Sequence, residues 1–93
     1  MKKLTVFYLE NCPYCVKAQK ALKELKAENP AYEKADIQWI EESRNQKIAD
    51  NYDYYYVPCV FCGNEKIYEC SPADDYGTIK LKLEAALKTA AEG

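Results

Sequence analysis

The chain has 93 residues, of which 48% are hydrophobic and 30% are charged, and its formal net charge is −2. Such a composition is typical of a globular protein, and the length predicts a single domain over residues 1–93. The balance of charge lacks the basic excess of a nucleic-acid-binding module, so no nucleic-acid partner is expected. The absence of histidine from the sequence excludes Ser-His-Asp hydrolysis, Cys-His proteolysis and His-ligated zinc.

Two strands joined by a helix are predicted for the first half of the chain. Residues 4–9 form a nearly continuous apolar run with Val, Phe and Tyr, which is typical of a strand buried on both faces. A helix is predicted to begin at Pro13 and to stop at Asn29-Pro30. Residues 37–40 predict a second strand, which the crossover makes parallel to the first and its neighbour. The apolar face of the helix is expected to carry Val16, Ala18, Leu22 and Leu25.

The middle of the chain predicts a short helix followed by a strand that contains a proline. Ser43-Arg44-Asn45-Gln46 matches a capping box, which marks a helix N-terminus. Residues 54–61 are rich in Tyr, Val and Phe and predict a strand with Pro58 inside it. The apolar side of the short helix is expected to carry Ile48, Ala49 and Tyr52.

A hairpin and a last helix are predicted for the remainder. Gly63-Asn64 between two strand-like runs indicates a tight turn into a strand over residues 66–70. Ser71-Pro72-Ala73-Asp74 predicts a helix start with Ser as the cap, and Gly77 is expected to interrupt this helix. The order β-α-β-α-β-β-α predicts an α/β fold with a four-stranded mixed sheet and three helices on its two faces. The apolar face of the last helix is expected to carry Ile79, Leu83, Ala86, Leu87 and Ala90.

The cysteine content is the unusual chemical feature of this sequence. Residues 4–9 are too short for the apolar region of a signal peptide, and no apolar run reaches the length of a membrane span. We therefore expect a cytoplasmic monomer without a membrane partner. In that reducing compartment, five cysteines indicate redox chemistry, metal binding or simple packing rather than a disulfide framework.

The motif Cys12-Pro13-Tyr14-Cys15 joins the first predicted strand to the first predicted helix. Cys12 is expected at or next to the helix N-cap, where unpaired backbone N–H groups and the positive end of the helix dipole favour thiolate over thiol. Cys15 lies about one turn further, on the inner side. The pattern predicts a redox dithiol in which Cys12 attacks a disulfide and Cys15 resolves the mixed disulfide.

Val57-Pro58 is the second feature with a chemical interpretation. A proline inside a strand pattern usually places that strand at a sheet edge. A cis bond between Val57 and Pro58 at the start of the strand accommodates the proline as well. It turns the Val57 backbone toward the cysteines, where it is free to pair with an extended substrate. Tyr14 and Tyr56 are then expected to flank the substrate groove.

The order of elements, the C-P-Y-C motif, Val57-Pro58 and the glycine turn together resemble a dithiol glutaredoxin of the thioredoxin-fold superfamily. The resemblance extends over nearly the whole chain, and Tyr8 before the motif also fits it. It implies a cytoplasmic thiol–disulfide oxidoreductase that reduces protein disulfides or glutathione mixed disulfides. No tightly bound cofactor is expected, because the dithiol itself carries two electrons, and glutathione is the implied co-substrate. Asp74 and Asp75 are implied to hold the γ-glutamyl end of glutathione, and the alternative is that they are first-turn acids that complement a helix dipole.

Two positions depart from the family pattern and leave a second electron donor open. Leu9 stands where glutathione-binding members often carry a lysine that meets a carboxylate. After the hairpin, the chain has Tyr68-Glu69-Cys70 in the region where the family usually has a Gly-Gly pair. The alternative is a thioredoxin-like protein that receives electrons from a flavoprotein disulfide reductase.

A small zinc-binding domain without catalysis is the alternative from another class. Cys59-Val60-Phe61-Cys62 is a second C-x-x-C, and paired motifs of this kind occur in zinc ribbons. Strand alternation sends Cys59 and Cys62 to opposite faces, which disfavours a zinc knuckle, so we expect no metal site. Cys59 is expected to be a buried packing residue, with an auxiliary thiol near the site as the alternative. Cys62 and Cys70 are expected in the core or the hairpin.

Overall fold

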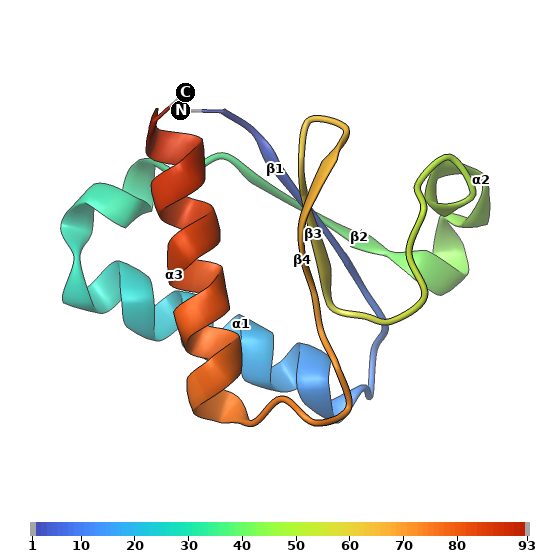
Figure 1. The fold of residues 1–93 in the computed structure, drawn as a ribbon, viewed down its shortest axis with the longest axis horizontal. Helices are drawn as coiled ribbons and strands as arrows, with labels where there is room; N and C mark the ends of the chain where they lie inside the picture. Colours follow the sequence, from blue (N-terminus) through green and yellow to red (C-terminus); the bar gives the residue numbers. More distant parts are fainter. Residues whose placement is uncertain (1, 93) are drawn as a thin grey trace.

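The computed structural model describes residues 2–92 and contains one mixed sheet of four strands in the order β2-β1-β3-β4 (Figure 1). The parallel pair is β1–β2, and the pairs β1–β3 and β3–β4 are antiparallel. This architecture confirms the predicted α/β fold. The strands are β1 (Leu4–Tyr8), β2 (Ile37–Glu41), β3 (Cys59–Cys62) and β4 (Glu65–Glu69).

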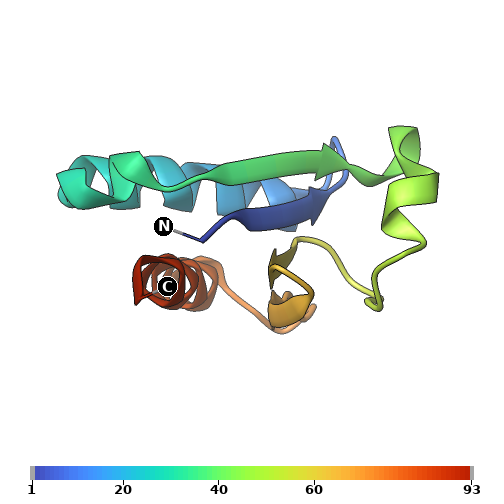
Figure 2. The same ribbon diagram turned by 90° about the horizontal axis from the view of Figure 1, so that it is seen from above.

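Two long helices lie on one face of the sheet and a one-turn helix lies beyond the other (Figure 2). α1 follows β1 directly, and α3 packs against α1. None of the helices in residues 2–92 is long and apolar enough to cross a membrane. The helices are α1 (Pro13–Glu28), α2 (Gln46–Ala49) and α3 (Tyr76–Glu92), with 3₁₀ turns η1 (Pro30–Lys34) and η2 (Glu42–Arg44).

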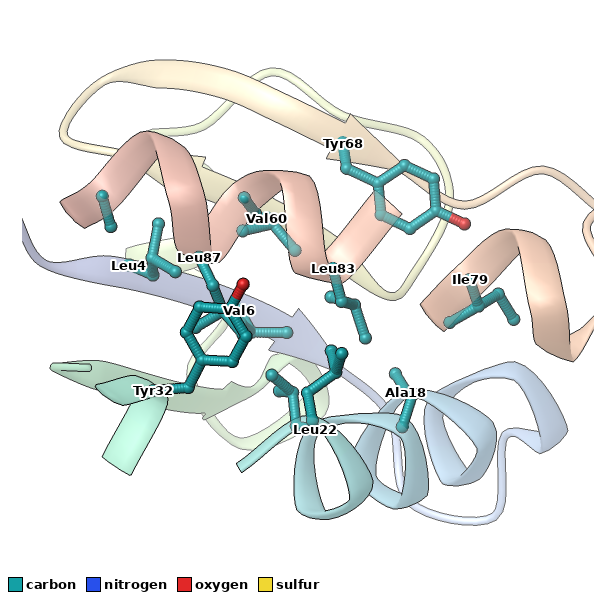
Figure 3. Close-up of a cluster of buried hydrophobic side chains, with 14 of the residues drawn as sticks. Leu4, Val6, Ala18, Leu22, Tyr32, Val60, Tyr68, Ile79, Leu83 and Leu87 are labelled. Atoms are coloured by element: carbon teal, nitrogen blue, oxygen red, sulfur yellow. The ribbon is translucent and has the colours of Figure 1, made fainter. Parts of the chain in front are cut away.

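The larger core lies between the sheet and the α1–α3 pair (Figure 3). All five apolar positions predicted for the last helix are buried. The prediction for Val16 is wrong, because this side chain is 58% exposed. One residue corresponds to about 100° of helix rotation, so Val16 turns away from the buried stripe that begins at Cys15. That stripe consists of Cys15, Ala18, Ala21, Leu22 and Leu25.

Aromatic rings fill a smaller core on the opposite face. Phe7 is fully buried and stacks on Tyr54, with ring centroids 5.0 Å apart. Tyr52 packs against both Phe7 and Phe61, each at a centroid distance of 4.8 Å. Ala49 of α2 is buried in the same cluster, whereas Ile48 is 43% exposed, contrary to its predicted apolar role. Because α2 has a single turn, the rings rather than a helix cover most of this face.

Three predicted boundaries are wrong for local reasons. The strand predicted over residues 54–61 begins only at Cys59, because residues 54–58 form a loop outside the ladder. Ser43 does not cap α2: it lies in η2 and its hydroxyl donates to Glu41, while Asn45 is the N-cap. Residues 71–74 form a turn instead of starting α3, which begins at Tyr76 and contains Gly77 in its first turn.

Candidate active site

The C-P-Y-C motif lies at the carboxyl end of β1 and starts α1. Cys12 is the N-cap, with an extended backbone (φ −86°, ψ 118°), and Pro13 is the first helical residue. Asn11 has a positive φ of 65°, a conformation that asparagine tolerates better than most residues. The Cys12 side chain makes no capping hydrogen bond and is half-buried. As the N-cap residue, Cys12 is next to the N–H groups of the first helical turn, which have no partner within the helix.

Cys15 lies one turn below Cys12 and is 1% exposed. The pKa of the Cys15 thiol is raised to about 12, mainly by burial and also by the neighbouring Cys12, while a hydrogen bond from the Leu9 N–H opposes the shift. That N–H lies 3.5 Å from Sγ of Cys15. Cys15 is therefore a protonated thiol at neutral pH, and the more exposed Cys12 is the accessible sulfur of the pair.

A buried carboxylate anchors the connection between β1 and α1. Glu41, at the end of β2, is 7% exposed and accepts a hydrogen bond from the Glu10 N–H at 3.0 Å. Its other oxygen accepts from the N–H and the hydroxyl of Ser43 at 2.7 and 2.6 Å. These donors, the Ser43 hydroxyl above all, lower the pKa of Glu41 to about 2. Sequence reasoning missed this residue, although Glu41 directly follows the strand predicted over residues 37–40, and it pairs with Tyr8 shortly before the motif.

The Val57–Pro58 peptide bond is cis, as the sequence predicted, and lies beside the end of β1. Cys59, the next residue, pairs with Phe7. The Pro58 carbonyl accepts a hydrogen bond from the Cys70 N–H at 3.0 Å. The backbone of Val57 makes no hydrogen bond within the described residues 2–92. Tyr56 is 54% exposed beside it.

The β4–α3 loop is bonded to the C-P-Y-C motif. The Tyr14 hydroxyl donates to the Pro72 carbonyl at 2.8 Å, which ties the motif to this loop. Asp74 accepts hydrogen bonds from the Tyr68 hydroxyl at 2.6 Å and from the Ser71 N–H at 3.1 Å, and these lower its pKa. Asp75 accepts from the Thr78 N–H at 2.8 Å, and this bond lowers its pKa. Both acids are thus engaged in local hydrogen bonds.

Glu69 contributes a contact that sequence reasoning also missed. One carboxylate oxygen accepts hydrogen bonds from the N–H groups of Tyr55 and Tyr56 at 2.5 and 2.8 Å. The other accepts from Nζ of Lys66 at 3.0 Å. The missing Gly-Gly pair was the available signal, since Tyr68 and Glu69 begin the region that replaces it.

The other three cysteines have different surroundings. Cys59 is fully buried in the aromatic core, and burial raises its pKa to about 12. Cys62 is half-buried against the larger core on the opposite face, so the two thiols point to opposite faces of the sheet, as strand alternation predicted. Cys70 is buried, and burial raises its pKa. Within residues 2–92, no three Cys, Asp or Glu residues gather in a group suited to a metal ion.

A hollow of about 310 Å³ lies beside the buried thiol and includes Cys15, Leu9 and Val16 in its lining. A second hollow, also of about 310 Å³, continues along α1 toward Trp39 and Lys26. The two share Tyr8 and Gln19. The second hollow contains neither thiol of the motif, so only the first belongs to the candidate site.

The fold and the dithiol at the start of α1 define a protein of the thioredoxin superfamily. A thioredoxin-like protein from Clostridium perfringens has a TM-score of 0.62 and 28% identity, covering 97% of this chain and 71% of that one. Thioredoxin 1 from Thermosipho africanus has a TM-score of 0.59 and 15% identity, covering 96% and 98%. A mutant thioredoxin from Halobacterium salinarum has a TM-score of 0.57 and 24% identity, covering 89% and 72%.

The glutaredoxin family model matches residues 4–67, so the chain belongs to the glutaredoxin family. No curated protein matches it. Family and fold together make the chain a thiol–disulfide oxidoreductase of the thioredoxin superfamily.

Proposed function

We propose that this protein reduces disulfides of proteins and peptides through the Cys12–Cys15 dithiol. The observation that carries the proposal is the pairing of an accessible thiol at the α1 N-cap with a buried thiol one turn below it. The unbonded Val57 backbone, which precedes the strand paired with β1, supports an extended peptide as substrate. We also propose that Tyr14 and Tyr56 flank the bound substrate.

The first step is attack of the Cys12 thiolate on one sulfur of the substrate disulfide. A new sulfur–sulfur bond joins Cys12 to the substrate, and the other substrate sulfur leaves as a thiolate that takes up a proton. Cys15 does not compete for this attack, because burial raises its pKa to about 12 and keeps its proton in place. The N-terminus of α1 stabilises the attacking anion.

In the second step, Cys15 attacks Cys12 in the mixed disulfide and releases the remaining substrate thiol. The negative charge of Cys12 is one of the causes that raise the pKa of Cys15. Formation of the mixed disulfide removes that charge, so Cys15 loses its proton more readily in the second step than in the first. The products are the Cys12–Cys15 disulfide and a substrate reduced by two electrons and two protons, without a prosthetic group.

We infer that the electron donor is a flavoprotein disulfide reductase rather than glutathione. Asp74, the residue implied to hold the γ-glutamyl end of glutathione, already accepts hydrogen bonds from Tyr68 and Ser71. Glu69 occupies the N–H groups of Tyr55 and Tyr56 in the loop before Pro58. Leu9 offers no charge to a glutathione carboxylate. These contacts favour a protein donor, and the proposed setting is a reducing compartment such as the cytoplasm.

Insulin reduction driven by dithiothreitol tests the chemistry, because this assay needs no specific donor. We expect the wild-type chain to be active and the Cys12→Ser variant to be inactive. The Cys15→Ser variant should accumulate the mixed disulfide with the substrate. A second assay compares NADPH consumption with thioredoxin reductase and with glutathione plus glutathione reductase. Turnover with thioredoxin reductase alone supports the proposed donor, and robust turnover with glutathione overturns it. Full activity of Cys12→Ser refutes the assignment of the site.

A further inference from the structure

The backbone of the loop before Pro58 is held by side chains of β4 rather than by backbone–backbone hydrogen bonds. The Tyr54 side chain of this loop packs on Phe7 and donates to Glu42 at 2.6 Å. Residues 53–57 make no backbone–backbone hydrogen bond within residues 2–92. Their backbone is bonded instead to Glu69, through the N–H groups of Tyr55 and Tyr56, and to Lys66, through the Asp53 carbonyl at 3.3 Å. A segment without ladder hydrogen bonds belongs to the least stable part of a fold unless other contacts order it.

Glu69 occupies the position from which a side chain can order this loop. It is the last residue of β4 and pairs with Cys59, the residue after Pro58. Its side chain is 19% exposed, and both carboxylate oxygens are occupied by donors. Burial alone would raise its pKa, but the N–H groups of Tyr56 and Tyr55 and the Lys66 ammonium lower it. Hydrogen bonds to such an ionised acceptor are about twice as strong as neutral ones.

We propose that Glu69 is a positioning residue for disulfide reduction, which fixes residues 55–57 so that the Val57 backbone can pair with an extended substrate segment. This inference rests on the proposed function. Tyr55 and Tyr56, whose N–H groups donate to Glu69, directly precede Val57. On the other side of Val57, the Pro58 carbonyl accepts a hydrogen bond from the Cys70 N–H. Val57 is therefore anchored from both directions while its own N–H and C=O stay unbonded within residues 2–92.

The substrate class follows from this arrangement. A fixed backbone segment with unbonded N–H and C=O groups binds a substrate by pairing with its main chain. The expected substrates are therefore disulfides of peptides and proteins. A small disulfide without a peptide backbone has nothing to pair with Val57 and reports only the reactivity of Cys12. Loss of the hydrogen bonds from Tyr55 and Tyr56 to Glu69 (the Glu69 clamp) should therefore slow the reduction of peptide and protein disulfides. The rate with a small disulfide should stay unchanged.

The experiment compares the two substrates in the wild-type chain, Glu69→Ala, Glu69→Gln and the control Glu65→Gln. Glu65 is an exposed residue at the other end of β4. Insulin reduction with dithiothreitol measures a substrate with a main chain, and the reaction of the reduced protein with 2,2′-dipyridyl disulfide measures one without it. For Glu69→Ala, we expect kcat/KM with insulin to fall about tenfold, mainly through KM, and the dipyridyl disulfide rate to stay within about twofold.

The variants separate positioning from simple structural damage. Glu69→Gln should recover most of the insulin activity, because its amide oxygen can still accept the two N–H groups, and Glu65→Gln should behave like wild type. Amide hydrogen exchange should accelerate at Tyr55 and Tyr56 in Glu69→Ala and stay unchanged in the control.

Several results would overturn the clamp. These are equal insulin kinetics in wild type and Glu69→Ala, an equal loss on both substrates, or unchanged exchange at the Tyr55 and Tyr56 amides. The failure of the proposed function looks different, since the wild-type chain itself would then fail to reduce insulin. The exchange measurement still decides whether Glu69 orders the loop in that case.

Discussion

Removal of the Tyr68 hydroxyl tests how the β4–α3 loop is held. Tyr68 is 7% exposed, and its ring packs in the larger core with the hydroxyl at the edge (Figure 3). The hydroxyl donates to Asp74 at 2.6 Å, and the same carboxylate oxygen accepts from the Ser71 N–H. Tyr68→Phe removes this hydrogen bond and keeps the ring, so no cavity forms.

The expected cost follows from the chemistry of the acceptor. A hydrogen bond to a charged group contributes about 1.5–3 kcal/mol net. Asp74 is half-buried, so water can hydrate the carboxylate once the hydroxyl is gone, which reduces the cost to about 1–1.5 kcal/mol. For a domain of this size, that loss lowers the melting temperature by roughly 4–12 °C.

The cost should also depend on pH in a definite direction. The folded-state pKa of Asp74 is lowered from its ordinary value of 3.8, with the Tyr68 hydroxyl as the main cause. Stability from this bond is therefore fully present above that value and is lost as the pH falls through the folded-state pKa. The difference between wild type and Tyr68→Phe should shrink when urea denaturation is repeated in acid.

Tyr32→Phe provides the matched control for this measurement. Tyr32 is 5% exposed in the same core, and its hydroxyl donates to Glu84 at the longer distance of 3.2 Å. We expect a smaller loss of stability there. A change below about 0.3 kcal/mol in Tyr68→Phe, or a cost that grows in acid, would refute the role assigned to the Tyr68–Asp74 bond.

Three further variants test other parts of the structure. Glu41→Gln should remove a contribution to stability that depends on pH. The wild-type chain loses this contribution as the pH falls from 4.5 toward the folded-state pKa of Glu41 of about 2. The urea midpoint of the variant should not show this fall with pH. Phe7→Ala should cost about 3–5 kcal/mol in urea denaturation, and a cost below about 1 kcal/mol would contradict the packing of the aromatic core. Cys59→Ala should lower stability by about 1 kcal/mol and leave insulin reduction unchanged, because a fully buried thiol takes no part in turnover. Lost activity in a folded Cys59→Ala protein would show that this thiol has a catalytic task.

The sequence predicted those parts of the fold that local patterns determine. Apolar periodicity located the buried face of α3, and Pro13 and Asn29 marked the ends of α1 within one residue. Gly63, with a φ of 61°, marked the hairpin turn because glycine adopts that conformation without strain. The parallel β1–β2 pair followed from the crossover between them.

Contacts between distant residues escaped prediction. Tyr14 and Pro72 are separated by 58 residues, and Glu10 and Glu41 by 31, so no local pattern reports that they meet. The strand-like composition of residues 54–58 reflects aromatic packing rather than ladder hydrogen bonds. Tyr54 stacks on Phe7 although it lies in a loop. The side chains of these residues are typical of strands, but their backbone makes no ladder hydrogen bonds, and a strand is defined by its backbone pairing.

Two residues at the end of β4, in the region where the family usually has a Gly-Gly pair, bind two loops of this chain. Tyr68 and Glu69 are neighbours in β4, so their side chains leave opposite faces of the sheet. The Tyr68 ring packs in the larger core, and its hydroxyl at the edge of this core donates to Asp74 and holds the β4–α3 loop, to which Tyr14 of the motif is bonded. Glu69 reaches the loop before Pro58 on the other face. The end of one edge strand thus binds both the β4–α3 loop and the loop before Pro58, with groups that a pair of glycines cannot supply.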